Sequence, residues 1–137
     1  EQDLLAFIND LENIGDVVDK NLMELAKKKV KNGLVFSQEG IKEIEEFYKK
    51  ILENFEIGVS AFVSGDAGLA KKLLASKVEL AEMERELRQA HIQRLHKGLK
   101  ESIDTSSIHL DVLSNLRRIN SYISNVAYPI VEVRDNL

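Results

Sequence analysis

The fold of this 137-residue chain is decided by a stretch near its N-terminus, Asp10-Leu11-Glu12-Asn13-Ile14-Gly15-Asp16-Val17-Val18-Asp19-Lys20-Asn21. Its carboxylates Glu12, Asp16 and Asp19 recur at intervals of four and three residues, so they form one line along a helix. Apolar positions recur at heptad-like spacing beside them: Leu4, Ile8, Leu11, Gly15, Val18, Leu22 and Leu25. The stretch predicts an amphipathic helix with three acids at the edge of its buried face. Such acids either bind a cation shared between helices or are simply hydrated.

The composition fits a single folded helical domain. Apolar residues make up 44% of the chain and charged residues 31%, with one proline and no cysteine. Without cysteine, neither a disulfide framework nor a thiolate zinc site can form. The net charge of −4 argues against a nucleic-acid partner, because phosphate contacts need a clustered surplus of Lys and Arg. The chain begins at Glu1 without a methionine, so we expect a fragment of a larger protein.

Four helices are predicted, and short connections make neighbouring helices antiparallel. The first three span residues 3–31, 38–64 and 67–102, and the fourth follows the cap cluster at 104–107 and bends at Pro129. The sequence therefore predicts an all-α, up-down-up-down bundle. The predicted buried line of the second helix is Ile41, Ile44, Tyr48, Ile51, Phe55, Gly58 and Phe62, and that of the third is Leu69, Leu73, Leu80, Met83, Leu87, Ala90 and Leu95.

Two further groups of residues have competing interpretations. The lysines near the end of the first helix, Lys27, Lys28, Lys29 and Lys31, either complement the helix dipole or grip phosphate or an anionic membrane surface. His91 and His96 are five residues apart and share a helix face poorly. We therefore expect these imidazoles to be hydrogen-bonded or solvated rather than metal ligands.

Three segments resemble the PhoU family, whose members regulate phosphate uptake. Residues 11–16 are similar to the acidic E-x-x-x-D motif of that family, and residues 116–121 occupy the place of its second copy. His91-Ile92-Gln93-Arg94-Leu95 is similar to the end of a long charged PhoU helix. Together with Ala127-Tyr128-Pro129, the chain looks most like the cytoplasmic PhoU-like tail of bacterial sodium/phosphate cotransporters. The resemblance implies one domain over residues 1–137, made of the last helix of one three-helix bundle and a complete second bundle.

The resemblance also implies a metal site, because PhoU proteins bind metal clusters through both motif copies. Glu12 and Asp16 match the first copy, and Asp19 extends it. In the second copy, Arg117 and Ser121 stand where Glu and Asp would be. A residual site for a divalent or iron-type ion at Glu12, Asp16 and Asp19, completed by another chain, is therefore one expectation.

A salt bridge is the alternative to that metal site. Arg117 and Arg118 could pair with the acidic line across the bundle, so that an internal cation replaces the metal. This interpretation would explain the acids of the first helix and the arginines of the last helix together.

The function implied by the resemblance is regulatory rather than catalytic. It is that of a domain which senses or gates phosphate transport through a membrane transport domain of the same or a partner protein, at the inner face of the cell membrane. A free-standing metal-binding regulator of phosphate uptake and a self-associating bundle, such as a homodimer that covers an apolar edge, remain alternatives. A carboxylate-bridged metalloenzyme would need Glu-x-x-His pairs, and the sequence contains none.

Overall fold

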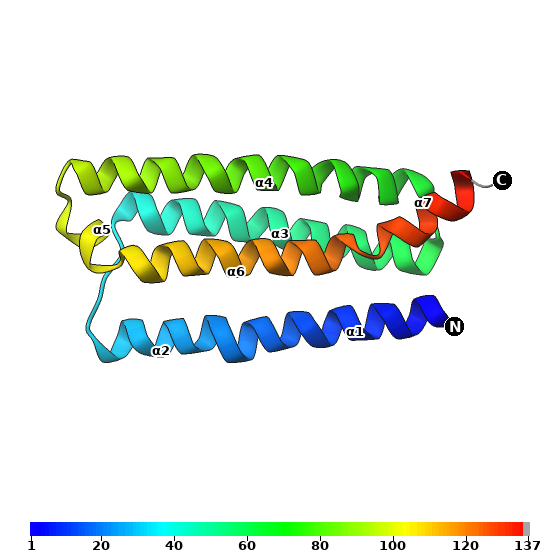
Figure 1. Cartoon of the computed structure of the whole chain (residues 1–137), viewed down its shortest axis with the longest axis horizontal. Helices are drawn as coiled ribbons and strands as arrows, with labels where there is room; N and C mark the ends of the chain where they lie inside the picture. The colour runs from blue at the N-terminus through cyan, green and yellow to red at the C-terminus, as the bar shows by residue number, and fades with distance from the viewer. Residues whose placement is uncertain (136–137) are drawn as a thin grey trace.

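The computed structural model describes residues 1–135, which form helices joined by short connections (Figure 1). The first long helix comprises α1 (Gln2–Asp16), a π-helical stretch η1 (Val17–Leu22) and α2 (Met23–Lys31), which continue one another without a break. The remaining helices are α3 (Gln38–Ser64), α4 (Ala67–His96), α5 (Lys100–Asp104), α6 (Ser106–Ser124) and α7 (Ala127–Asp135). This order confirms the predicted all-helical class.

The long helices alternate in direction, which confirms the predicted up-down-up-down topology (Figure 1). Helices α3, α4 and α6 pack against one another as a three-helix bundle, and α7 extends α6 along α4. The first long helix lies on the outside of this bundle, where α1, η1 and α2 all contact α6. One flank of the first helix is therefore free of the bundle.

The predicted caps determine several helix ends. The Ser37 hydroxyl accepts a hydrogen bond from the Gly40 amide at 3.0 Å, and the Asp66 carboxylate accepts one from the Leu69 amide at 2.9 Å. Gly65 ends α3 with a φ of 67°, a left-handed conformation that glycine adopts without steric cost. The boundaries between the first three helices were therefore predictable from local chemistry.

The third predicted helix is too long. α4 ends at His96, and residues up to 102 do not continue it because Gly98 takes a φ of 74°. The short helix α5 then turns the chain toward α6. A glycine inside a helical pattern costs only about 1 kcal/mol, so the sequence pattern alone did not decide between a helical Gly98 and a terminator.

The last predicted helix is divided, but Pro129 is not where it breaks. The interruption lies at residues 125–126, and Pro129 belongs to the first turn of α7. The first amides of a helix have no intrahelical acceptor, so a proline there loses no hydrogen bond. Pro129 thus marks the start of a new helix rather than a bend within one.

The core of the bundle contains the expected aliphatic side chains together with an unexpected phenylalanine. Leu73, Leu80 and Leu87 of α4 are buried, as predicted. In α3, however, the predicted Ile41 and Tyr48 are exposed, and Phe47 is buried instead. The whole buried apolar cluster comprises Val17, Phe47, Ile51, Ala70, Leu73, Leu80, Leu87, Leu113, Leu116, Ile119, Ile123, Val126 and Ala127.

The face of the first helix that meets α6 also differs from the prediction. Phe7, Ile14 and Val17 pack toward the core. Of the predicted line, Leu22 and Leu25 are half-buried, whereas Leu4, Ile8, Leu11, Gly15 and Val18 are exposed. The helix carries two adjacent apolar stripes, and the buried one includes polar contacts that periodicity overlooks. These contacts are Asp10 with Asn125 at 3.0 Å and Asn21 with Asn115 at 3.1 Å.

Candidate functional site

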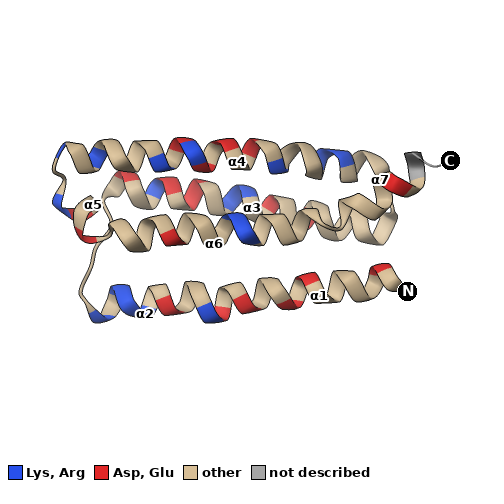
Figure 2. Cartoon of the chain, in the orientation of Figure 1, with Lys and Arg blue, Asp and Glu red and all other residues tan. Residues whose placement is uncertain are grey.

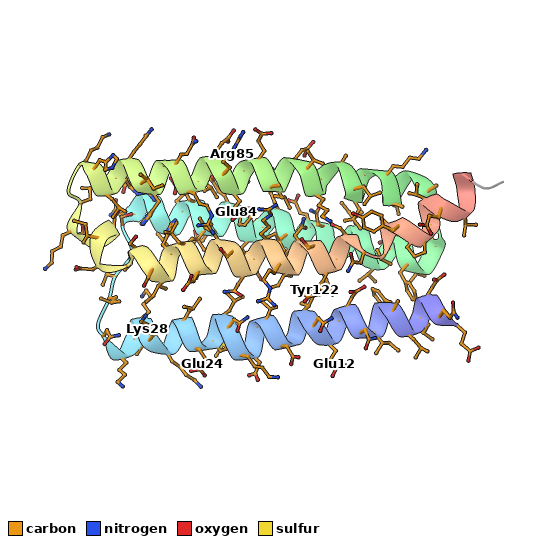
Figure 3. The ribbon with its side chains drawn as sticks, in the orientation of Figure 1. Glu12, Glu24, Lys28, Glu84, Arg85 and Tyr122 are labelled. Atoms are coloured by element: carbon orange, nitrogen blue, oxygen red, sulfur yellow. The ribbon has the colours of Figure 1, made fainter. Side chains whose placement is uncertain are left out.

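The predicted metal ligands Glu12, Asp16 and Asp19 all lie exposed on the first helix. Figure 3 shows Glu12 pointing away from the bundle, and Figure 2 shows acidic positions along the length of the first helix. Asp16 pairs with Lys20 on the same helix at 3.5 Å, and both side chains are more than half exposed. The acidic line is therefore open to solvent and not enclosed by the bundle.

The described residues bring no other helix's carboxylate or imidazole to these acids. Among the side chains that the structure describes, no group of three or more His, Asp or Glu is arranged to hold a metal ion. A metal ion at Glu12, Asp16 and Asp19 remains a prediction, and its further ligands would have to come from another chain.

The expected salt bridge between the acidic line and the arginines of the last helix is wrong. Arg117 pairs instead with Glu84 of α4, with its Nη1 atom 3.2 Å from Oε2 of Glu84. Arg118 has one long contact, 3.5 Å from Nη1 to the Asn115 side-chain oxygen. The reason is the orientation of the side chains: Arg117 lies on the side of α6 that faces α4, and the acids lie on the exposed side of the first long helix.

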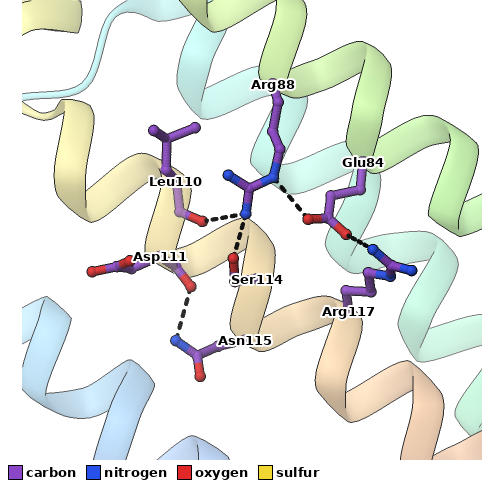
Figure 4. A network of polar contacts seen from close by, with 7 residues as sticks. All are labelled: Glu84, Arg88, Leu110, Asp111, Ser114, Asn115 and Arg117. Atoms are coloured by element: carbon purple, nitrogen blue, oxygen red, sulfur yellow. Dashed lines mark hydrogen bonds and ion pairs between the residues drawn. The ribbon is translucent and has the colours of Figure 1, made fainter.

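Glu84 is the centre of a polar network between α4 and α6 (Figure 4). Its side chain is only 7% exposed, and its Oε1 atom accepts a hydrogen bond from Nε of Arg88 at 2.8 Å. Arg88 also donates to the Leu110 carbonyl oxygen at 3.3 Å and to the Ser114 hydroxyl. A buried carboxylate is costly unless it is paired, so these contacts hold Glu84 in the interface.

The sequence analysis missed Glu84, because it lies among the many charged residues of α4. Its partner Arg88 is one helical turn further along the same face, a spacing that also occurs in ordinary surface pairs. Only the packing of α6 against α4 distinguishes Glu84 from a surface acid. This packing buries the Glu84 carboxylate and brings the half-exposed guanidinium of Arg117 to it.

An open cavity of about 320 Å³ lies beside this network. It is lined by Glu84 of α4 and by Ser114, Arg117, Arg118 and Ser121 of α6. Arg117 and Ser121 are the residues that replace the acids of the second PhoU-like motif. The cavity therefore occupies the place of that motif, with positive charge and hydroxyl groups in its lining.

A second polar cluster lies where the ends of α3, α4 and α6 meet. The imidazoles of His91 and His109 are buried and stacked, with ring centroids 4.5 Å apart. Nε2 of His91 is hydrogen-bonded to the Ser106 hydroxyl at 2.9 Å, and Arg94 donates two hydrogen bonds to Glu43 at 2.8 and 3.0 Å. His96 is exposed. His91 is thus hydrogen-bonded and His96 is open to solvent, two environments that the sequence analysis allowed for these imidazoles.

Burial and nearby positive charge disfavour protonation of the stacked imidazoles. Burial lowers the pKa of His109 from 6.5 to about 4, and the positive charges of His91, Arg94 and Arg88 lower it in the same direction. Burial and then Arg94 lower the pKa of His91, against the opposing effect of Glu43. Two stacked imidazolium ions would repel each other, so protonation would work against this packing.

An apolar groove of about 340 Å³ runs between the first helix and α3, over α6. Its exposed rim includes Val18 of η1 and Tyr48 and Leu52 of α3, and α6 contributes Leu116 and Ile119. Leu4 and Leu11 of α1 are exposed and recur at heptad spacing with Val18, so they continue this surface toward the N-terminus. A contiguous apolar surface of this kind is typical of a protein contact site.

The antiparallel all-helical bundle is consistent with a PhoU-type helical domain, and the sequence comparison identifies the family. The model of the PhoU domain family matches residues 44–130. The chain belongs to the PhoU domain family.

Two kinds of relative are similar to the chain. The putative inorganic phosphate export protein YjbB of Salmonella typhimurium is 36% identical over 126 residues, which are 92% of this chain and 23% of that protein. Its Escherichia coli K12 counterpart matches to the same extent. The phosphate-specific transport system accessory protein PhoU homolog 1 of Thermotoga maritima is 25% identical over 133 residues, which are 95% of this chain and 54% of that protein.

The chain thus spans about a quarter of the length of the export proteins that it matches. A comparison with solved structures finds no match. Among the helices of residues 1–135, none combines the length and the apolar character needed to cross a membrane.

Proposed function

We propose that this chain is a non-catalytic regulatory domain of phosphate transport, the PhoU-like cytoplasmic part of a sodium/phosphate cotransporter at the inner face of the cell membrane. The observation that carries the proposal is the apolar groove between the first helix and α3. A regulatory domain acts through a contact, and this groove is the surface on which the contact would form.

The occupant that we propose for the groove is the membrane transport part of a longer protein. The relatives named as phosphate export proteins are about four times as long as the matched segment. In such proteins a helical domain of this size is covalently joined to much additional chain. This favours the interpretation that the apolar groove contacts another part of the same protein, and not that it faces solvent. The link to transport is consistent with the names of both kinds of relative.

A charge placed in the groove should uncouple the domain from transport. In the source organism, Leu52→Glu is expected to change phosphate flux by about fivefold or more, because a buried carboxylate at the contact would disfavour docking. The measurement is uptake and efflux of radiolabelled phosphate. Leu52 is 43% exposed in α3, so the substitution should leave the fold intact, which circular dichroism checks.

The matched control is Val78→Glu, which adds the same charge at an exposed position of α4 outside the groove. It should leave phosphate flux unchanged. Equal flux in the wild type and in Leu52→Glu would count against the proposal. Sedimentation of the chain as a dimer that Leu52→Glu dissociates would identify a second copy as the occupant and favour the self-associating bundle.

A free-standing, metal-binding regulator of phosphate uptake is the second candidate function. It is favoured by the match over 95% of this chain to the accessory protein of Thermotoga maritima. In this case Glu12, Asp16 and Asp19 would bind a divalent or iron-type ion together with ligands from another chain. Carboxylate oxygens are suitable ligands for hard cations. Here, however, all three carboxylates lie on one exposed helix face, which does not enclose an ion.

Elemental analysis of the purified chain separates the two candidate functions. We expect the metal content to stay well below one ion per chain, and we expect Glu12→Ala/Asp16→Ala to change the free energy of unfolding by less than about 0.5 kcal/mol because both acids are exposed. One ion per chain that disappears in the double variant would favour the metal-binding regulator. Glu24→Ala/Glu56→Ala, which removes two other exposed acids, is the control for net charge.

A further inference from the structure

We propose that the cavity between α4 and α6 binds a phosphate-type oxyanion, held by Arg117 and Arg118 and by the hydroxyl groups of Ser114 and Ser121. The cavity has a volume of about 320 Å³ and opens to solvent beside the Glu84 network. A water molecule occupies about 30 Å³ of liquid, so this space admits a tetrahedral anion together with several waters.

The charge of the lining favours an anion. Arg88, Arg117 and Arg118 bring three guanidinium groups to this region, and Glu84 is the one acid among the lining residues. Both oxygens of Glu84 already face guanidinium groups, Oε1 toward Arg88 and Oε2 toward Arg117. The carboxylate is therefore neutralised within the interface, and the positive charge that remains is directed to the open side.

The donors needed to hold an oxyanion are in place. The Arg117 side chain is 53% exposed and uses one nitrogen on Glu84, so other N–H groups of its fork remain available. Arg118 is exposed, and its one described contact is the long one to Asn115. Ser114 accepts a hydrogen bond from Arg88, which leaves its own hydrogen free to donate. Arginine forks recognise phosphate by paired hydrogen bonds.

Glu84 has a positioning role in this arrangement. Its buried carboxylate fixes Arg117 at the rim of the cavity, where a free arginine would sample many rotamers. A fixed donor loses less conformational entropy when it binds an anion. The guanidinium that stands in place of a family carboxylate thus makes the site suited to an anion instead of a metal cation.

The proposal deepens the proposed function, on which its link to transport rests, but binding can be measured independently. The probe is inorganic phosphate, added to the 137-residue chain at constant ionic strength and followed by NMR of the arginine Nε–Hε groups. We expect saturable shifts of the Arg117 and Arg118 signals with a Kd on the order of 1 mM. Arg118→Gln should raise that Kd about tenfold or more, because it removes a charged donor.

The control variant is Lys27→Gln/Lys28→Gln, which removes positive charge from exposed side chains of α2 that do not line this cavity. It should bind phosphate as the wild type does. Arg118 has little contact with the fold, so Arg118→Gln should keep the wild-type thermal midpoint. The proposal would be overturned by two results together. The phosphate-induced NMR shifts would fail to saturate or would be the same in both variants, and both variants would bind equally to vesicles that contain phosphatidic acid.

A lipid phosphate headgroup presents the same chemistry, so a second arm uses vesicles of phosphatidylcholine with or without phosphatidic acid. Cosedimentation that needs phosphatidic acid and is lost in Arg118→Gln would identify a headgroup as the source of the phosphate. Cosedimentation lost only in Lys27→Gln/Lys28→Gln would assign the headgroup contact to the lysines. If the Arg117 and Arg118 signals also did not respond to free phosphate, this result would overturn the proposal. Flux that responds to Leu52→Glu, while neither free phosphate nor phosphatidic acid binds through Arg118, would overturn this proposal and leave the proposed function standing.

Discussion

The Arg94→Leu variant is expected to unfold with a free energy about 3 kcal/mol lower than that of the wild type, the cost of breaking a buried ion pair. Arg94 joins α4 to α3 through its two hydrogen bonds to Glu43, and the two side chains are 10% and 20% exposed. Without Arg94, the Glu43 carboxylate would stay largely out of water with no counter-charge. Urea denaturation followed by circular dichroism at 222 nm measures the difference.

Arg85→Leu is the matched control, because Arg85 pairs with Glu82 on the same helix in a largely exposed position. It should cost less than about 1 kcal/mol, as surface pairs do. The double variant Glu43→Leu/Arg94→Leu should recover part of the loss, since two apolar side chains leave no unpaired charge. Equal losses in Arg94→Leu and Arg85→Leu would show that the Arg94–Glu43 pair has no special weight.

The Arg94–Glu43 pair explains the His-x-x-Arg-Leu pattern, which the sequence analysis identified only by its resemblance to PhoU proteins. His91 and Arg94 belong to the His-x-x-Arg-Leu pattern of the PhoU-like helix, and both are buried on the face of α4 that meets α3 and α6. Their partners, Glu43 and His109, come from other helices. Helical periodicity marks apolar residues as buried, so it could not assign these polar side chains to the core.

The helix boundaries were predictable where a cap defines them and less so elsewhere. Ser37, Gly65 and Asp66 end or begin helices by local hydrogen bonds and backbone preferences, so a short window of sequence is sufficient. The end of α4 depends on Gly98, whose left-handed conformation leads the chain into α5, and α5 packs back against α4. Tertiary context therefore decided the boundary that the sequence pattern did not.

The candidate site was half predictable. The substitution of Arg117 and Ser121 into the second PhoU-like motif was visible in the sequence and indicated lost metal ligands. The true partner of Arg117 was not visible, because Glu84 lies on a helix with acids and bases on several faces. Likewise, α1 has two apolar stripes, and only the position of α6 determines which one is buried.

Stability should fall in acid because of the stacked histidines. The pKa of His109 is about 4 in the folded chain and 6.5 in the reference state, so the unfolded chain binds the proton more tightly. The contribution is complete above pH 6.5 and is lost as the pH falls toward 4. The loss amounts to about 3 kcal/mol over the full range, of which about 2 kcal/mol falls above pH 5, where most carboxylates remain ionised.

Urea unfolding at pH 7, 6 and 5 tests this origin. His109→Gln, which does not titrate, should flatten the pH dependence, whereas His96→Gln, at an exposed position of α4, should retain it. The groups that face His109 are His91, Arg94 and Arg88 of α4, with Glu43 of α3 paired to Arg94. A slope that persists in His109→Gln would place the titrating group elsewhere.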